Sequence, residues 1–168
     1  MANSPGQGRI HQVYIGLGSN INPEQNLPLA LTLLSQHVQV VAVSRVWETQ
    51  PVESVGANFL NAAALISTQL SAQLLKNVVL RPIESYVGRR RSFNKNAPRE
   101  IDLDILIYNG QILDTKIWKR AFLAVPLAEL LPDIRHPDTH ETLQEIAVRL
   151  AAKEVLIPRP DITLVSAS

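Results

Sequence analysis

The chain has 168 residues, of which 46% are hydrophobic and 18% charged, and it carries a formal net charge of +1 and no cysteine. This length and composition predict one soluble globular domain, and they exclude disulfides, thiolate metal sites and cysteine nucleophiles. The near-neutral charge argues against a general nucleic-acid binder, and no apolar run reaches the ~20 residues of a membrane-spanning helix.

The N-terminal segment, residues 1–11, lacks an apolar signal core and is expected to be a disordered lead-in. Nothing in this segment marks the chain for export, and a lack of cysteine is typical of proteins in a reducing compartment. We therefore expect a cytoplasmic protein in which residues 12–168 form a single domain.

The first part of the chain predicts three strands and one helix. "VYIGLGSNI" (13–21) is rich in β-branched residues and ends at a Gly-Ser-Asn turn, which is typical of a strand. Asn22 can cap a following helix of about four turns, with Pro23 at its first position. Apolar alternation over 38–48 predicts a second strand whose apolar side is broken by a serine, and residues 58–70 predict a third.

A second helix is predicted between Ser71 as its cap and Gly88 as its stop. Pro82 lies inside this helix and is expected to kink or divide it. The basic loop "GRRRSFNKNAPR" then leads into a strand over 101–108, and the pair "NG" after it predicts a turn into a short return strand.

The C-terminal part predicts a short helix at 125–132, a longer one at 140–153, and a tail at 154–165 that adds an edge strand. The order β-α-β-β-α-β is typical of an α+β fold, a ferredoxin-like antiparallel sheet with helices packed on one face. An all-parallel doubly wound sheet is disfavoured, because no helix separates the strands at 38–48 and 58–69.

Asp102 and Asp104 stand one residue apart in the strand over 101–108. Successive strand side chains point to opposite faces, so both carboxylates share one face with Leu106. The other face is expected to consist of Ile101, Leu103, Ile105 and Ile107. Two carboxylates roughly 7 Å apart can bind hard cations such as magnesium, which takes one or two carboxylates plus water and phosphate oxygens.

The loop before this strand is strongly basic. Between 89 and 99 it holds five positive residues and no acidic one: Arg89, Arg90, Arg91, Lys95 and Arg99. Carboxylates for a metal beside guanidinium groups are what binding of a triphosphate requires. Two plainer interpretations stay open at this point, a solvated pair of aspartates and a solvated basic loop.

Two other phosphate-transfer chemistries fit less well. A haloacid-dehalogenase-type phosphatase needs its nucleophilic aspartate just past the end of a buried strand, whereas "ILIY" continues the strand after Asp104. A P-loop kinase is excluded because the chain has no G-x-x-x-x-G-K-[ST] motif.

Several segments together resemble one enzyme family. They are "YIGLGSN" (14–20), "SRVWETQPV" (44–52), "NFLNAA" (58–63), "IESYVGRRR" (83–91), "APREIDLDILIYNG" (97–110) and "RAFLAVPLAELLPDIRHPD" (120–138). In this order they resemble 6-hydroxymethyl-7,8-dihydropterin pyrophosphokinase, a folate-pathway enzyme with a ferredoxin-like fold that moves a diphosphate from ATP to a pterin alcohol and releases AMP.

The resemblance implies roles at the matching positions. Asp102 and Asp104 are implied to bind two magnesium ions between ATP and the pterin hydroxyl, with catalytic assistance from Arg89 and Arg99. The implied ATP-binding residues are Glu84, Arg89, Arg91, Arg99 and Ile105. The implied pterin-binding residues are Thr49, Val52, Phe59, Asn61 and Phe122, and Arg120 is implied to lie near the transferred diphosphate.

Some of these residues also have structural interpretations. Phe59 and Phe122 could simply belong to the core, and Gly16 and Gly18 could permit close packing. Asn61 differs, because an amide within "FLNAAALI" is costly to bury without hydrogen-bond partners. A flat heterocycle held by aromatic rings would supply such partners.

The chain departs from the family pattern in two places. Many relatives carry a tryptophan just before the "PR" of the basic loop, where this chain has Asn96. The family also has a "VPH" segment whose histidine faces the phosphates, whereas this chain runs from "ILDTKIW" directly to "KRAF". None of its histidines aligns with that position: His11, His37, His136 and His140. His136 is instead expected to cap a turn.

The resemblance thus implies an ATP-dependent pyrophosphokinase that acts on two small molecules, ATP and 6-hydroxymethyl-7,8-dihydropterin. We expect it to act as a monomer, without nucleic acid or membrane. The main alternative is a catalytically impaired relative that serves as a nucleotide- or pterin-binding or regulatory subunit. An RNA-binding module is a weaker alternative, because the strands lack the exposed aromatic residues of RNA-recognition sheets.

Overall fold

The computed structural model describes residues 8–52, 56–88 and 98–165, and the elements below lie in these ranges. The strands are β1 (His11–Ser19), β2 (Gln39–Val43), β3 (Trp47–Thr49), β4 (Phe59–Thr68), β5 (Asp102–Tyr108), β6 (Gln111–Ile112) and β7 (Leu156–Pro158). The helical segments are α1 (Pro23–Ser35), α2 (Ala72–Leu74), the π-helical η1 (Leu75–Leu80), α3 (Arg81–Val87), the 3-10 turn η2 (Thr115–Trp118), α4 (Ala121–Leu130) and α5 (Leu143–Ala151).

The strands form one antiparallel sheet in the order β6-β5-β1-β4-β3-β7, and β2 also pairs with β4. β1 lies at the centre of this sheet, between β4 and β5. Its alternation buries Val13, Ile15 and Leu17 on one face and leaves the small Gly16 and Gly18 on the other. The predicted α+β fold with a ferredoxin-like antiparallel sheet is therefore confirmed.

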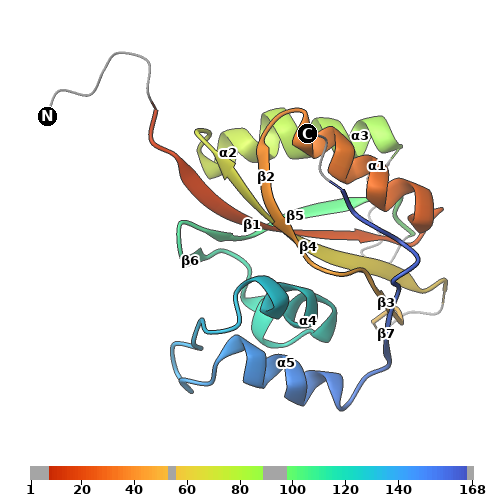
Figure 1. Cartoon of the computed structure of the whole chain (residues 1–168), viewed down its shortest axis with the longest axis vertical. Coiled ribbons are helices and arrows are strands. Elements are labelled where there is room, and N and C mark those ends of the chain that lie inside the picture. The colour runs from red at the N-terminus through yellow and green to blue at the C-terminus, as the bar shows by residue number, and fades with distance from the viewer. Residues whose placement is uncertain (1–7, 53–55, 89–97, 166–168) are drawn as a thin grey trace, which may run out of the picture.

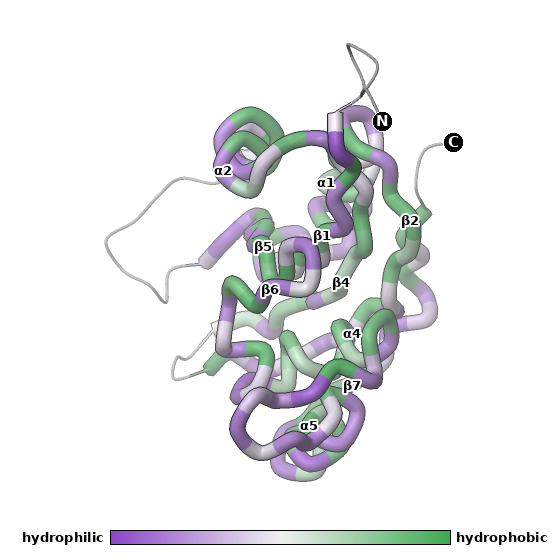
Figure 2. Tube along the Cα trace, turned by 90° about the vertical axis from the view of Figure 1, so that its left-hand side faces the viewer, coloured by the Kyte–Doolittle hydropathy of each residue, from purple (hydrophilic) through white to green (hydrophobic). Residues whose placement is uncertain are grey.

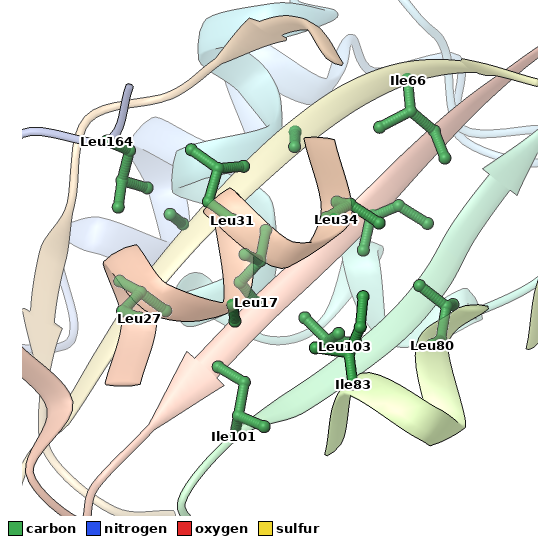
Figure 3. Packing of buried hydrophobic residues seen from close by; sticks show 14 of the residues in the cluster. Leu17, Leu27, Leu31, Leu34, Ile66, Leu80, Ile83, Ile101, Leu103 and Leu164 are labelled. Atoms are coloured by element: carbon green, nitrogen blue, oxygen red, sulfur yellow. The ribbon is translucent and has the colours of Figure 1, made fainter. Parts of the chain in front are cut away.

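Helices cover both faces of the sheet (Figure 1). On one face, α1, η1 and α3 pack their leucines and isoleucines against β1 and β5, as Figure 3 shows for Leu31, Leu34 and Ile83. On the other face, α4 and α5 cover Leu106 and Ala63. Figure 2 shows the same two-sided arrangement after a quarter turn.

The prediction of helices on one face only was therefore wrong. Ala63 of β4 and Leu106 of β5 give the second face an apolar area, and that area needs a cover of its own. Leu127 of α4 and Ile146 of α5 supply this cover, and both side chains are buried. The second helical layer has a consequence for function, because the start of α4 reaches the end of the sheet where the aspartates lie.

The second predicted strand is divided at Ser44 into β2 and β3, and both parts pair with β4. The Ser44 hydroxyl accepts a hydrogen bond from the Ala63 amide at 2.8 Å and donates to the Arg45 carbonyl at 2.8 Å. The serine hydroxyl thus provides hydrogen-bond partners for a backbone amide and a backbone carbonyl at the point where the strand is interrupted. β7 pairs with β3, so the predicted C-terminal edge strand is confirmed.

The helical run after Ser71 is divided in the way that Pro82 predicts. Ser71 caps it by accepting from the Leu74 amide at 3.2 Å, and Gly88 ends it with φ of 114°. Between these residues the run changes from α2 to the π-helical η1 and back to α3. Proline has no N–H to donate and its ring crowds the carbonyl four residues earlier, so a regular α-helix cannot pass through Pro82 unchanged.

β5 contains a bulge that changes its side-chain pattern. Tyr14 pairs with Ile107 and Ile15 pairs with Ile105, so Leu106 is an extra residue opposite β1. Ile107 therefore packs in the same cluster as Leu106, not beside Ile105 as the strict alternation predicted. The bulge follows Asp104, so the shared face of the two aspartates is preserved.

Several other boundaries differ in detail. β1 begins at His11, inside the predicted lead-in of residues 1–11, of which residues 1–7 lie outside the described part. Asn22 stands at the start of α1 as predicted, but with left-handed backbone and no capping bond from its side chain. α4 begins at Ala121, four residues before the predicted short helix. In the described ranges, every helix is too short or too polar to cross a membrane.

Candidate active site

Asp102 and Asp104 occupy the face of β5 that adjoins the two glycines of β1. Gly18 pairs with Asp102, and Gly16 pairs with Asp104. Both carboxylates line a cavity of about 520 Å³. The other residues around this cavity are Gly16, Leu17, Gly18, Thr49, Gln50, Val52, Phe59, Asn61, Arg99, Asp114, Lys116, Arg120, Phe122 and Leu123.

The floor of this large cavity holds a buried amide. Asn61 and Thr49 are each only 5% exposed, and Asn61 Nδ2 donates to Thr49 Oγ1 at 2.7 Å. Asn61 Oδ1 lies over Gly18, where a Cβ atom would approach it to 2.9 Å. The bond to Thr49 fixes the amide plane, and the glycine leaves room for it. Gly18 thus permits close packing, as predicted.

Phe59 and Phe122 enter the large cavity from opposite parts of the chain. Phe59 begins β4 and Phe122 follows Arg120 at the start of α4. Both rings are half-buried and line the cavity together with Val52, and neither belongs to the two buried clusters of the core. The structure thus places all five predicted pterin-binding residues, and Arg120, around one cavity.

A second cavity of about 270 Å³ lies on the other side of the aspartates. It shares four residues with the large cavity: Arg99, Asp102, Asp104 and Lys116. Its other residues are Lys76, Leu80, Arg81, Glu84 and Leu103. The two cavities therefore meet at the carboxylate pair that the sequence indicated.

Arg99 is held against the aspartates by the turn that follows β1. The Arg99 amide donates to Asn20 Oδ1 at 2.7 Å, and its carbonyl accepts from the amides of Asn20 and Ile21 at 3.0 and 3.3 Å. Its guanidinium then bonds Asp102 Oδ2 at 2.5 Å. The two side chains of this ion pair are partly buried, with 27% of Arg99 and 20% of Asp102 exposed.

Glu84, which the family resemblance implies to bind ATP, lines the second cavity. Glu84 is only 5% exposed, and its Oε2 accepts a hydrogen bond from the Leu103 amide at 3.1 Å. Ile105 is half-buried in β5 and is not among the residues that line either cavity. Arg89 and Arg91 lie outside the described residues.

The sequence reasoning missed Lys116 and its partner Asp114. They begin the 3-10 turn η2, where Asp114 Oδ1 accepts from the Lys116 amide at 3.0 Å and Oδ2 lies 3.8 Å from Lys116 Nζ. Lys116 lines both cavities, in the segment where the family's histidine is absent. The one local signal was "DTK", an aspartate that can cap a turn and orient a lysine two residues later.

The donor set suits a hard cation. In the described ranges, no group of three or more His, Cys, Asp or Glu residues could hold a metal alone. Two aspartates that face both cavities suit magnesium, because it completes its coordination with water and substrate phosphates. Arg99, Lys116 and Arg120 around them would balance phosphate charge.

His136 has the turn-capping role that the sequence predicted. Its Nδ1 accepts from the amides of Asp138 and Thr139 at 3.1 and 3.3 Å, and its ring meets the edge of Trp118 with 5.1 Å between centroids. His136 is absent from the lining of both cavities.

Comparison with known proteins adds an independent observation. The family model of 7,8-dihydro-6-hydroxymethylpterin-pyrophosphokinase (HPPK) matches residues 14–132. The chain is 36% identical over 146 residues to the 2-amino-4-hydroxy-6-hydroxymethyldihydropteridine pyrophosphokinase of Aquifex aeolicus, a match that covers 79% of this chain and 88% of that protein. The Bacillus subtilis protein of the same name is 36% identical over 150 residues, and this match covers 82% of this chain and 88% of that protein.

Among solved structures, a crystal structure of HPPK-DHPS from Plasmodium falciparum matches with a TM-score of 0.70. The match covers 89% of this chain and 47% of that chain, at 14% sequence identity. At this identity the likeness concerns the fold alone.

Proposed function

The chain belongs to the 7,8-dihydro-6-hydroxymethylpterin-pyrophosphokinase family of folate-synthesis enzymes, and from this we propose that it transfers diphosphate from MgATP to the hydroxymethyl group of 6-hydroxymethyl-7,8-dihydropterin and releases AMP. One observation supports this assignment most. The two cavities have different linings, one partly aromatic and one almost entirely polar, and they meet at Asp102 and Asp104. A reaction between a heterocycle and a polyphosphate needs such an arrangement.

The pterin would occupy the large cavity. Phe59 and Phe122 offer aromatic surface to a flat ring, and Asn61, oriented by Thr49, offers an amide to its polar edge. Val52 would complete the apolar wall. The hydroxymethyl group of the pterin would then face the aspartates.

The triphosphate of ATP would extend from the second cavity across Asp102 and Asp104 toward Arg120. We propose that these two aspartates hold two magnesium ions, and that Arg99 and Lys116 neutralise phosphate oxygens from both cavities. Magnesium, when bound, would stabilise charge on the attacking and leaving oxygens. Arg89 and Arg91 would contribute further positive charge from the basic loop.

The proposed reaction needs no protein nucleophile. The pterin hydroxyl attacks the β-phosphorus, a new P–O bond forms, the bond to the α-phosphate oxygen breaks, and AMP leaves while the hydroxyl proton passes to water. The protein contributes position and charge, because both cavities hold their ligands against the same pair of carboxylates. No observation favours the alternative of a binding or regulatory subunit. We further propose that the enzyme acts as a monomer in the cytoplasm.

An assay of the purified chain tests this function. Incubation with ATP, magnesium and 6-hydroxymethyl-7,8-dihydropterin should produce AMP and the pterin diphosphate in equal amounts. Omission of magnesium or addition of a chelator should stop the reaction. Formation of ADP would indicate transfer of a single phosphate, and absence of any nucleotide product would contradict the proposal.

A further inference from the structure

Glu129 joins the helix α4 to the segment from which the strand β3 begins. Its Oε1 accepts from the Arg45 amide at 3.2 Å and from Arg45 Nε at 3.1 Å, and its Oε2 accepts from Trp47 Nε1 at 2.6 Å. The Arg45 guanidinium also lies over the Trp47 ring, 4.9 Å from its centroid. A carboxylate near the end of α4 therefore binds both the backbone and the side chains at the start of β3.

The hydrogen bonds of Glu129 differ in what they contribute. The Arg45 side chain is 65% exposed, so its ion pair with Glu129 adds little to stability. The other two donors are a backbone amide and the indole N–H of Trp47, and hydrogen bonds from such donors to a carboxylate are stronger than those to a neutral acceptor. These two bonds therefore fix the position of the start of β3 relative to α4.

β3 has only three residues, and its end adjoins the buried amide of the large cavity. Trp47 pairs with Asn61 across the β3–β4 ladder, and Thr49, two residues later on the same face, accepts the bond from Asn61 Nδ2. α4 packs against β3 and β4 (Figure 1), and its Leu127 is fully buried. The bond between Glu129 and Trp47 therefore constrains where Thr49 lies beside the Asn61 amide.

We propose that Glu129 is a positioning residue for pterin binding, which acts through Trp47 on the Asn61 amide. This proposal rests on the proposed function, in which that amide meets the polar edge of the pterin. Glu129 itself lines neither cavity. Of the residues that the structure describes, those around the second cavity include none from β3, β4 or α4, so nucleotide binding should not depend on Glu129.

The test uses Glu129→Gln and Trp47→Phe, with steady-state kinetics and with calorimetry of pterin binding in the presence of α,β-methylene ATP. A glutamine directs an N–H group toward either the Arg45 amide or the Trp47 indole, and both are donors, so one bond is lost. Trp47→Phe keeps an aromatic ring and removes the donor. Each variant should raise the dissociation constant and the KM for the pterin by about three- to tenfold. The KM for ATP and kcat should stay within about twofold.

The double variant shows whether the two residues act through one bond. With the Trp47 donor already removed, Glu129→Gln should weaken pterin binding by no more than about a further twofold, whereas independent effects would multiply. Glu141→Gln is the matched control, because Glu141 accepts two bonds from Arg149 and lines neither cavity. This control should leave all constants unchanged.

A merely structural role of Glu129 would lower the urea midpoint without a selective effect on the pterin. Pterin binding within about twofold of the original chain in both single variants would overturn the positioning role. An equal loss of affinity for the pterin and for α,β-methylene ATP, or multiplied effects in the double variant, would also overturn it. If the original chain released no AMP and bound neither ligand, the proposed function itself would fail, and measurements on the original chain alone reveal this.

Discussion

Gly18 and Asn61 face each other across the β1–β4 ladder, and the lack of a side chain at Gly18 leaves the space in which the Asn61 amide lies. A Cβ atom at Gly18 would stand 2.9 Å from Asn61 Oδ1. The amide has little freedom to retreat, because its nitrogen is bonded to the buried Thr49. The position of the Asn61 amide in the large cavity therefore depends on the absence of a side chain at Gly18.

We predict that Gly18→Ala impairs pterin binding selectively. The displaced amide should raise the KM for the pterin by about tenfold or more, since a buried polar contact is lost, while the KM for ATP changes little. Steady-state kinetics with each substrate varied in turn measures this. Gly56→Ala is the control, because a Cβ atom there meets nothing within 4 Å. Equal effects of the two substitutions would contradict the proposed contact.

Asp102→Asn and Asp104→Asn should each abolish turnover while leaving the fold intact. Loss of one carboxylate charge from the proposed metal site is expected to lower the rate of AMP release by about a thousandfold or more. Circular dichroism and the urea midpoint should stay close to those of the original chain. Asp133→Asn, in an exposed position outside both cavities, provides the control. Near-normal AMP release by either variant would show that the metal is held elsewhere.

Lys116→Met should reduce kcat by about ten- to a hundredfold, because it removes a cation that lines both cavities at the proposed site of transfer. Lys116→Arg should restore most of the activity, since the charge is kept. Lys119→Met changes a nearby lysine that lines neither cavity and should have little effect. Rates within twofold of the original for Lys116→Met would mean that this side chain takes no part in the transfer.

Arg159 joins the C-terminal tail to the rest of the fold. It donates to Glu48 at 2.8 Å and to Asp161 at 2.9 and 3.0 Å, and it lies 3.7 Å from Glu24. Arg159→Gln should lower the free energy of unfolding at pH 7 by about 1 kcal/mol, measured by urea denaturation. Arg149→Gln, which breaks a more exposed single pair with Glu141, should lower it less.

The effect of Arg159→Gln should also depend on pH. The hydrogen bond from Arg159 lowers the pKa of the Asp161 carboxyl below its ordinary value of 3.8. Because the pKa of this carboxyl is lower in the folded than in the unfolded protein, its ionised form stabilises the fold. The stabilisation is complete at pH values above the pKa of the unfolded protein, and it is lost as the pH falls through the pKa of the folded protein. The difference in unfolding free energy between the original chain and the variant should therefore shrink below about pH 4. A constant difference down to pH 2 would contradict this role of Asp161.

The part of the site that could be predicted from the sequence depends on local geometry. Two aspartates at alternate positions of a strand must share a face, whatever the strand packs against. The turn at Asn109 and Gly110 is similarly local, since both have the positive φ values, 48° and 80°, that a tight hairpin requires. Their positions could therefore be predicted without knowledge of the partner strands.

The rest depended on contacts between distant segments. The bulge at Leu106 exists only in relation to β1, so no pattern within β5 reveals that Ile107 changes face. Lys116 reaches both cavities only because η2 docks beside β5 before α4 begins. Pro82 predicted a disturbance of the helix, but a proline alone does not specify which disturbance occurs, so the π turn of η1 could not be predicted.

The bond between Glu84 and the Leu103 amide has a consequence for solubility. β6 pairs with β5 only at Ile107 and Tyr108, so the first residues of β5 border no other strand on that side in the described ranges. Open strand edges invite hydrogen bonding with strands of other molecules and so promote aggregation. Glu84 occupies one amide of this edge with a carboxylate, which a foreign strand would have to displace. Glu84 therefore protects this amide of the β5 edge from pairing with a foreign strand.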